Sequence, residues 1–321
     1  MQKQQCNLAV LKILSEESDE EHLIKSDQIL DELETNYDVS IERHKVVSVI
    51  STLRDFMYPI KSIKKNGGYM LLSHLFTKSE LILLCTSIQS ATFVDQKTSD
   101  NLTERILGTG SKYHKHSYRS HVFHNNEKKV NNDQFSKSIS TIYDAIDQGR
   151  KISFDYMHYK EDMQLHIVNK EPIIVEPREI TTRNGQLYLL VTGGRHPGFM
   201  SYRIDKIANV AILEEKVTYM YQDKDAIELA NERLYMYNGD NLNVTFRFKK
   251  NKLDQFVDAF GLNIHPHTYN DDQYECYVKT TKAAAILFAQ EYSDCVELIS
   301  PEELRESMRT LLNTAADMYS K

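Results

Sequence analysis

The segment SIERHKVVSVISTLRDFMYPIKSIKKNGGYMLL (residues 40–72) combines a helical repeat with a hairpin pattern. Its apolar residues step by four, three and four along one stripe of a helix, which would pack inward: Val46, Ile50, Leu53 and Met57. Pro59 ends this helix, because proline cannot continue it. Residues 64–68 (KKNGG) then form a turn between two short strands, since an Asn-Gly pair tolerates positive φ. The segment therefore predicts a helix followed by a β-hairpin with a basic tip.

Two further helices precede this segment. Leucines spaced by three indicate the first helix around residues 8–14, and a second apolar repeat covers residues 26–37, with Ser26 as a candidate N-cap. Ser40 is a candidate cap of the third helix, whose first turn carries Glu42 where the helix dipole favours a negative charge. Three helices closed by a basic hairpin are typical of a winged helix-turn-helix, so we expect such a domain at residues 1–73.

Charge is distributed unevenly along the chain. The net charge of −7 argues by itself against nucleic-acid binding, because phosphates attract cationic surfaces. Between Glu16 and Asp38, ten acidic residues stand against one lysine, whereas residues 40–65 hold six Lys or Arg against two acids. The basic charge is thus concentrated on the third helix and the hairpin.

These two elements supply the candidate DNA-binding residues. The helix face opposite the apolar stripe would meet base edges in the major groove: His44, Lys45, Ser48, Ser51 and Thr52. The flanking and hairpin cations would meet phosphates: Arg43, Arg54, Lys61, Lys64 and Lys65. The alternatives are a merely solvated helix face and a charged hairpin tip that keeps an edge strand soluble.

Residues 74–135 are expected to form a helical linker. Two helices are predicted to begin at Thr77, which has a capping-box spacing, and at Ser99. Residues 111–132 are polar, so we expect an exposed connection with at most one short extended piece. Four histidines of this region match no zinc spacing, and a solvated loop is preferred over a metal site: His114, His116, His121 and His124.

The pattern becomes typical of strands from Lys151, where the apolar period changes to two. We expect a unit at residues 136–218, in which a helix that Gly149 caps precedes a small all-β part from Lys151 with a turn at residues 183–185 (RNG). After Glu215, helices and strands alternate, which indicates a split β-α-β sandwich at residues 219–321, with its first helix near 225–235. The chain is therefore expected to be an α+β multidomain protein.

Several short motifs follow one another in and around the β unit. The order is 142–146 (IYDAI), 152–156 (ISFDY), 176–177 (EP), 187–189 (LYL) and 202–207 (YRIDKI). In these motifs the chain resembles WYL-domain transcriptional regulators, with leucine in place of the tryptophan of the Trp-Tyr-Leu triplet. The aromatic-Arg-hydrophobic-Asp-basic-Ile run at 202–207 is the most specific of them.

The resemblance covers nearly the whole chain and implies its architecture. In bacterial or phage regulators of this type, a winged helix precedes an Sm-like small β-barrel, and a C-terminal extension assists dimerisation. The barrel is implied to sense a nucleic-acid or nucleotide ligand, including single-stranded DNA. One departure concerns the arginine usually found shortly before the proline of the barrel, because Ile173 and Ile174 stand there.

Five residues of the β unit are candidates for ligand binding: Tyr156, Arg178, Tyr188, Arg203 and Lys206. Two cations beside an aromatic ring suit phosphate and base recognition, so Arg203 and Lys206 would meet phosphate and Tyr188 would stack. Tyr156 and Arg178 are included because each stands at the end of a strand. The alternatives are a tyrosine that only packs in its sheet and an Arg203 that pairs with Asp205 or Glu176.

The sequence carries no catalytic or cofactor signature. It has no GxSxG, GxxxxGK[ST], HExxH or glycine-rich dinucleotide motif. Its four cysteines lie far apart, which indicates reduced thiols. No apolar run approaches a membrane span and the N-terminus lacks a signal-peptide pattern, so we expect a cytoplasmic protein.

We therefore expect a ligand-responsive regulator that binds a double-stranded DNA operator as a homodimer. It is expected to need no metal or cofactor and to have no enzymatic activity. The alternative is an accessory protein that binds single-stranded nucleic acid through its barrel and recognises no operator. A nucleotide-directed enzyme is a third hypothesis, for which the catalytic residues are missing. Preference for one inverted-repeat duplex would separate the first two.

Overall fold

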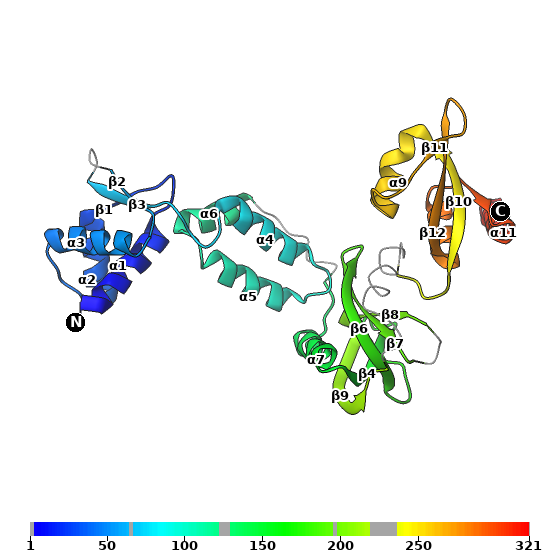
Figure 1. The fold of residues 1–321 in the computed structure, drawn as a ribbon, viewed down its shortest axis with the longest axis horizontal. Coiled ribbons are helices and arrows are strands. Elements are labelled where there is room, and N and C mark those ends of the chain that lie inside the picture. The colour runs from blue at the N-terminus through cyan, green and yellow to red at the C-terminus, as the bar shows by residue number, and fades with distance from the viewer. Residues whose placement is uncertain (1–2, 64–66, 122–128, 195–197, 219–235, 321) are drawn as a thin grey trace. The chain divides into compact units, whose positions relative to one another are not determined.

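The computed structural model describes residues 3–63, 67–121, 129–194, 198–218 and 236–320 (Figure 1). The chain divides into two compact units, residues 1–131 and residues 132–321. Mixed helices and strands occur in both. Within the described residues, no helix is both long and apolar enough to cross a membrane.

The first unit begins with three helices around one apolar core and a small antiparallel sheet. The helices are α1 (Lys3–Glu17), α2 (Ser26–Tyr37) and α3 (Arg43–Asp55). The strands β1 (Ile24–Lys25), β2 (Ile60–Ile63) and β3 (Gly68–Leu71) pair in the order β1-β3-β2. Apolar side chains from all three helices fill the core: Val10, Leu14, Ile29, Leu33, Val46 and Ile50. The helices and the hairpin expected from the sequence are thus present.

The C-terminal end of α3 differs from the expectation. The helix stops at Asp55, and Met57 has a φ of 68° and is 87% exposed. Met57 therefore does not continue the apolar stripe, and Val49 is the additional buried residue of α3. The apolar step of four between Leu53 and Met57 fits a helix, but the chain has already turned toward β2 at this point.

The caps of α2 and α3 also differ from the prediction. Lys25 precedes α2 and Glu42 precedes α3, so neither Ser26 nor Ser40 is an N-cap. The Ser26 hydroxyl instead donates a hydrogen bond to the carbonyl of Gly67, at 3.2 Å. This bond ties the start of α2 to the hairpin.

Three more helices complete the first unit: α4 (Lys78–Ser90), α5 (Gln96–Leu107) and α6 (Lys112–His121). Thr77 caps α4 and forms a capping box with Glu80, as the spacing predicts. The helix α5 begins before the expected Ser99, because the Asp95 carboxylate caps it by accepting the backbone N–H of Thr98 at 2.8 Å.

The helix α6 contradicts the prediction of an exposed connection at residues 111–132. Ser111, His114 and Tyr118 are buried at spacings of three and four, which is the period of a helix face. Their side chains are polar or aromatic, so the sequence shows no aliphatic repeat there. Of the four histidines of this region, His124 lies outside the described residues. Over the described ranges, no group of three or more His, Cys, Asp or Glu could hold a metal ion.

The second unit begins with α7 (Phe135–Gln148) and a curled half-barrel of antiparallel strands. The strands are β4 (Arg150–Tyr159), β5 (Leu165–Ile167), β6 (Ile173–Arg183), β7 (Gln186–Thr192), β8 (Met200–Arg203) and β9 (Ile207–Lys216). Their order is β5-β4-β6-β7-β8, and β9 also pairs with β4. The short 3-10 helix η1 (Ile204–Lys206) joins β8 to β9, and α7 packs against β4, β6 and β9. Asn184 and Gly185 both have positive φ in the tight turn from β6 to β7, as their sequence predicts.

The rest of the second unit is a sheet with helices on its apolar face. The strands are β10 (Asn241–Lys249), β11 (His267–Thr268), β12 (Gln273–Thr281) and β13 (Val296–Ser300), in the order β11-β12-β10-β13. The helices are η2 (Lys250–Lys252), α9 (Leu253–Phe260), α10 (Lys282–Glu291) and α11 (Glu302–Tyr319). Phe246 and Phe248 of β10 pack against Phe256 of α9, and the rings of Phe248 and Phe256 stack at 3.8 Å. The helix expected near 225–235 lies outside the described residues.

Candidate nucleic-acid interfaces

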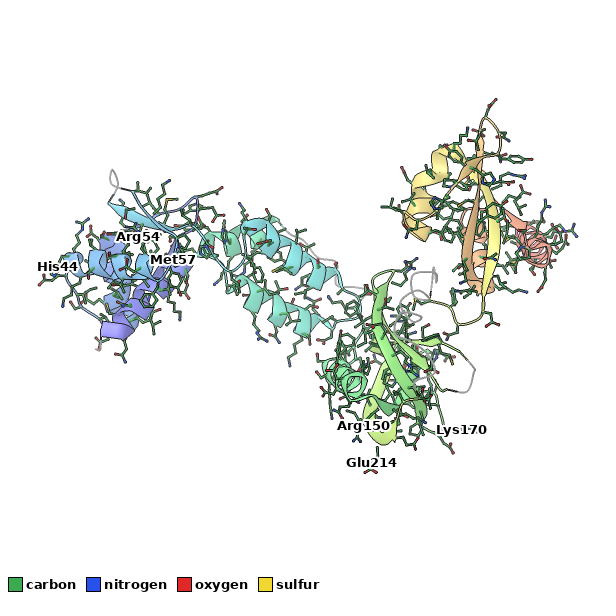
Figure 2. All side chains as sticks on the ribbon, viewed as in Figure 1. His44, Arg54, Met57, Arg150, Lys170 and Glu214 are labelled. Carbon is green, nitrogen blue, oxygen red and sulfur yellow. The ribbon has the colours of Figure 1, made fainter. Side chains whose placement is uncertain are left out.

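The face of α3 that points away from the core is polar and cationic. Most of its predicted site residues are exposed: Arg43, His44, Lys45, Ser48, Ser51 and Arg54. Thr52 is half-buried, and its hydroxyl donates to the carbonyl of Ser48 at 3.0 Å, within the helix. Figure 2 marks His44 and Arg54 on this helix. The exposed face can therefore present side-chain donors to a partner.

Val47 is a residue of this face that the sequence reasoning missed. It is 56% exposed and lies beside Ser48, although its branched apolar side chain is typical of a core. Apolar side chains in the major groove contact the methyl group of thymine. The signal was available, because Val47 lies outside the apolar stripe of the helix.

Two of the predicted side chains contact acidic residues, and these contacts are weak because the side chains are exposed to solvent. Arg43 Nη1 lies 3.7 Å from Asp27 Oδ1, and His44 Nδ1 lies 2.9 Å from Glu42 Oε2. All four side chains are more than half exposed. Exposed ion pairs contribute about 0–1 kcal/mol, so a phosphate can compete with Asp27 for Arg43, and the His44 contact leaves that ring able to reach a partner.

Arg54 has a structural role. Its Nε donates to the carbonyl of Ile60 at 2.8 Å, and its Nη2 donates to the Ser62 hydroxyl at 2.7 Å. These bonds brace the end of α3 against β2. Lys61 is exposed on that strand, whereas Lys64 and Lys65 lie outside the described residues.

The half-barrel brings four of the five ligand-binding candidates together. Tyr188 of β7 and Arg203 of β8 are direct partners across the two strands. The backbone N–H of Arg203 donates to the Tyr156 hydroxyl at 3.4 Å. Lys206 follows in η1, and its ammonium lies 5.9 Å from the centre of the Tyr159 ring. Two cations and two phenols thus share one region of the barrel.

Arg203 is held by a buried carboxylate. Its Nε and Nη2 donate to the two oxygens of Asp205 at 3.0 and 2.6 Å. The Asp205 side chain is fully buried, while that of Arg203 stays 28% exposed. The pairing with Asp205 considered from the sequence is therefore present. The fork geometry fixes the guanidinium, and its remaining N–H groups are still able to donate.

Burial shifts the pKa values of two groups in this region. It raises the pKa of Tyr156 to about 12, so the phenol keeps its proton at neutral pH. Burial also lowers the pKa of Lys206, and the nearby positive charge of Arg203 adds to that effect. The negative charge of an incoming anion would oppose both effects, because it stabilises the protonated ammonium of Lys206. The region is therefore suited to a phosphate.

Arg178 lies in a different, internal network. Its Nη2 donates to Glu176 Oε2 at 2.7 Å and to the carbonyl of Thr218 at 2.6 Å, and its Nε donates to the Thr192 hydroxyl at 2.8 Å. Both side chains of the Arg178–Glu176 pair are buried. The structure therefore does not place Arg178 beside Arg203.

Asn132 supports the cationic region, and the sequence reasoning missed it. Its amide nitrogen donates to the carbonyls of Asp205 and Ile207, each at 3.0 Å, and the residue is buried. These bonds hold the middle residue of η1 and the residue that follows it. Nothing in the polar segment around Asn132 distinguishes it from a loop asparagine.

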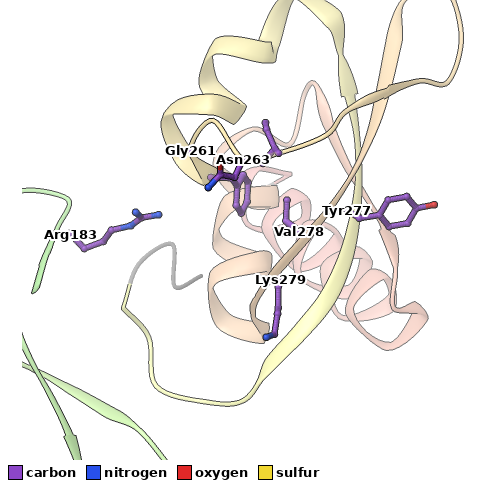
Figure 3. A pocket seen from close by; sticks show the side chains of 8 residues that line it. Arg183, Gly261, Asn263, Tyr277, Val278 and Lys279 are labelled. Carbon is purple, nitrogen blue, oxygen red and sulfur yellow. The ribbon is translucent and has the colours of Figure 1, made fainter. Parts of the chain in front are cut away.

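A cavity in the C-terminal part of the chain was not expected. Phe260, Gly261, Ile264 and Val278 contribute to its lining. Figure 3 shows Val278 and Tyr277 on opposite sides of β12, with the Tyr277 ring directed away from the other lining residues. No predicted site residue lines it.

The comparisons with known proteins concern the half-barrel first. Residues 137–212 match the model of the WYL domain family. Among curated proteins, none matches the chain. The solved structure of proteasome accessory factor B/C (PafBC) of Arthrobacter aurescens is similar at 13% identity and a TM-score of 0.30, over 99% of this chain and 49% of that one. The chain thus spans about half the length of that protein. A CRISPR Cas-related protein is similar at 15% identity and a TM-score of 0.40, over 99% of this chain and 84% of its own.

Proposed function

We propose that this chain, whose residues 137–212 form a WYL domain, is a DNA-binding transcriptional regulator that responds to a ligand of its barrel. One observation carries the proposal. In a chain of net charge −7, the exposed face of α3 presents cations and hydroxyl groups next to the cationic strand β2. Together the first three helices and the hairpin would then act as a winged helix-turn-helix, with α3 as the recognition helix.

The residues of α3 divide between two tasks under this proposal. Lys45, Ser48 and Ser51 read base edges, because they are exposed along the middle of the helix. Arg43 and Lys61 contact phosphates, which position the protein without reading sequence. Arg54 positions the hairpin through Ile60 and Ser62.

The WYL domain is proposed to bind single-stranded DNA or a nucleotide. Arg203 and Lys206 neutralise phosphate, and Tyr188 stacks on a base. An aromatic stack contributes about 1–3 kcal/mol, and a charge-assisted hydrogen bond about 1.5–3 kcal/mol. The ligand regulates only if it binds the DNA-competent and DNA-incompetent forms with different affinities.

The regulator is proposed to act as a homodimer and without catalysis. Two winged helices that read half-sites one helical turn apart gain both affinity and site length. The dimer would be held by residues 219–321.

The test is the salt dependence of duplex binding, measured by fluorescence anisotropy with a double variant Arg43→Ala/Lys61→Ala. Each lost phosphate contact should make the slope of log K against log salt shallower by about 0.9, so two contacts predict about 1–2 units. The matched control is Lys78→Ala/Lys97→Ala, which removes the same charge from exposed positions of α4 and α5.

Two results would contradict the proposal. Equal slopes for both double variants would remove α3 and β2 from the interface. A wild-type chain that binds single strands but no duplex would favour the accessory protein that recognises no operator.

A further inference from the structure

The half-barrel contains a cavity that none of the predicted site residues lines. Its volume is about 700 Å³, within the range of small-molecule sites. The segment between β5 and β6 forms one part of the lining, and β8 with Gly194 forms another. Six of the described lining residues are apolar or aromatic: Val168, Pro172, Ile173, Ile174, Met200 and Tyr202.

Hydrogen bonds and ring contacts brace part of this lining. The Asn169 side chain accepts the backbone N–H of Tyr156 at 2.7 Å and donates to Asp155 and to the carbonyl of Glu171, both at 2.8 Å. These bonds hold the β5–β6 segment against β4. The Tyr202 ring makes edge contacts with Phe154 at 5.1 Å and with Tyr156 at 5.2 Å. Binding would therefore cost little ordering of the site.

The charge of the cavity differs from that of the Arg203 region. Among the residues that the structure describes, Lys170 and Glu171 are the charged residues of the lining, and they are exposed and opposite in sign. Tyr202 and Arg203 are consecutive in β8, so their side chains point to opposite faces of the strand. The cavity and the cation pair are thus separate sites on two faces of one strand.

We propose that this cavity is a second subsite of the barrel, which takes an uncharged planar aromatic ring, the base of a nucleotide. The charges of the described lining residues Lys170 and Glu171 cancel, so these residues favour an uncharged group over a phosphate. The Tyr202 ring and the Met200 thioether offer polarizable surfaces to a flat ring. The choice of a base rests on the proposed nucleic-acid ligand, which would supply the ring.

Gly194 offers a way to fill the subsite selectively. A Cβ at this position would lie 3.6 Å from Val175 Cγ1 and 3.8 Å from Met200 Sδ, both ordinary contacts, and the residue has no positive φ. Gly194→Leu should therefore fold and project its side chain into the cavity. Gly194→Ala is the matched control, since one methyl group leaves most of the cavity open. Ile174 is 52% exposed, so Ile174→Asn tests the wall without adding charge.

The experiment titrates adenosine, which carries a base but no phosphate, into full-length protein with labelled isoleucine and methionine methyl groups. The methyl signals of Ile173, Ile174 and Met200 should shift in the wild type and in Gly194→Ala. Gly194→Leu should abolish the shifts, and Ile174→Asn should weaken adenosine binding about threefold or more. Unmoved signals in the wild type at millimolar adenosine, or equal shifts in Gly194→Leu, would overturn the proposal.

A second measurement separates this subsite from the proposed function. A short single-stranded oligonucleotide and its abasic counterpart, which keeps the phosphates, are compared for binding. The wild type should prefer the oligonucleotide with bases, because Tyr188 and the cavity would each take one base. Gly194→Leu should lower that preference about tenfold, the share of one stacked base, and keep the share of Tyr188. If adenosine shifts the methyl groups but neither oligonucleotide binds, the subsite stands and the nucleic-acid ligand is wrong. If Gly194→Leu keeps the full preference of the wild type, the base subsite is wrong and the proposed function stands; if the wild type binds both oligonucleotides equally, the subsite and the Tyr188 stack are both wrong and only the phosphate contacts stand.

Discussion

Arg203 is a residue on which the fold and the proposed ligand site both depend. Its guanidinium pairs with the fully buried Asp205. Removing one partner of a buried pair leaves an uncompensated charge, which costs about 3–5 kcal/mol. Because the Arg203 side chain is partly exposed, we expect the lower end of that range for Arg203→Ala.

The stability effect and the ligand effect of Arg203 can be separated. The double variant Arg203→Met/Asp205→Asn removes both charges, so its free energy of unfolding, measured with urea, should lie closer to the wild type than that of Arg203→Ala. Its affinity for a single-stranded oligonucleotide should still fall tenfold or more. A double variant that binds normally would show that Arg203 has only a structural role.

Glu176 makes stability depend on pH. Burial opposes its ionisation, but hydrogen bonds from Thr218 and Thr192 and the charge of Arg178 outweigh burial, and the pKa lies below its ordinary 4.5. A carboxyl with a depressed pKa stabilises the fold above its unfolded pKa, and this contribution is lost as the pH falls through the folded pKa.

The wild type should therefore lose unfolding free energy below about pH 4.5. In Glu176→Gln the free energy of unfolding should be lower at neutral pH and should depend less on pH in the acid range. Urea unfolding from pH 3 to 7 measures both, and identical slopes for the two proteins would contradict this account of Glu176.

At the scale of elements, the packing of α6 onto the loop after α1 depends on one buried carboxylate. Asp19 accepts hydrogen bonds from the Ser111 hydroxyl at 2.7 Å and from His22 Nδ1 at 2.8 Å. It also accepts the backbone N–H groups of Glu21 and His22, at 3.0 and 2.8 Å. His22 in turn stacks on Tyr113 at 3.7 Å. These contacts hold α6 against the loop that follows α1.

Asp19→Asn should loosen α6. The amide group replaces one acceptor oxygen with a donor, so one buried partner loses its hydrogen bond at a cost of about 1–3 kcal/mol. Hydrogen exchange should accelerate for the amides of α6, while α5 remains protected. Glu21→Gln is the control, because that side chain is exposed. Unchanged exchange in α6 would show that the Asp19 contact is dispensable.

The elements show how far a single sequence predicts the fold. The hairpin strands and the turn at Asn184 follow from period and turn chemistry, which act locally. The helix α6 was missed because its buried face consists of Ser111, His114 and Tyr118, so burial left no aliphatic repeat. Met57 was assigned to the apolar stripe because it lies four residues after Leu53, a helical spacing. The helix α3 nevertheless ends at Asp55, before Met57.

The sequence predicted the residue types of the candidate site better than it predicted which residues form ion pairs with one another. The sequence placed Tyr188 and Arg203 in neighbouring strands, and the structure makes them direct partners. The sequence could not decide which carboxylate binds Arg203, nor that Arg178 takes Glu176, because both choices depend on tertiary packing. Asn132 lies far from Asp205 in sequence, so its support of η1 left no local signal.

For the whole molecule, we propose that the first unit reads DNA and the second unit binds a ligand. The acidic surface of most of the chain should repel duplex DNA and leave binding to α3 and the hairpin. A dimer would read two half-sites related by a two-fold axis, so the operator should mirror that symmetry.

Selection of the preferred duplex from a random pool by the full-length protein tests this central claim most directly. The account predicts one enriched inverted repeat whose half-sites lie about one helical turn apart, and loss of its base preference in Lys45→Ala/Ser48→Ala. Enrichment of no duplex sequence, or of a site that the double variant selects equally well, would contradict it.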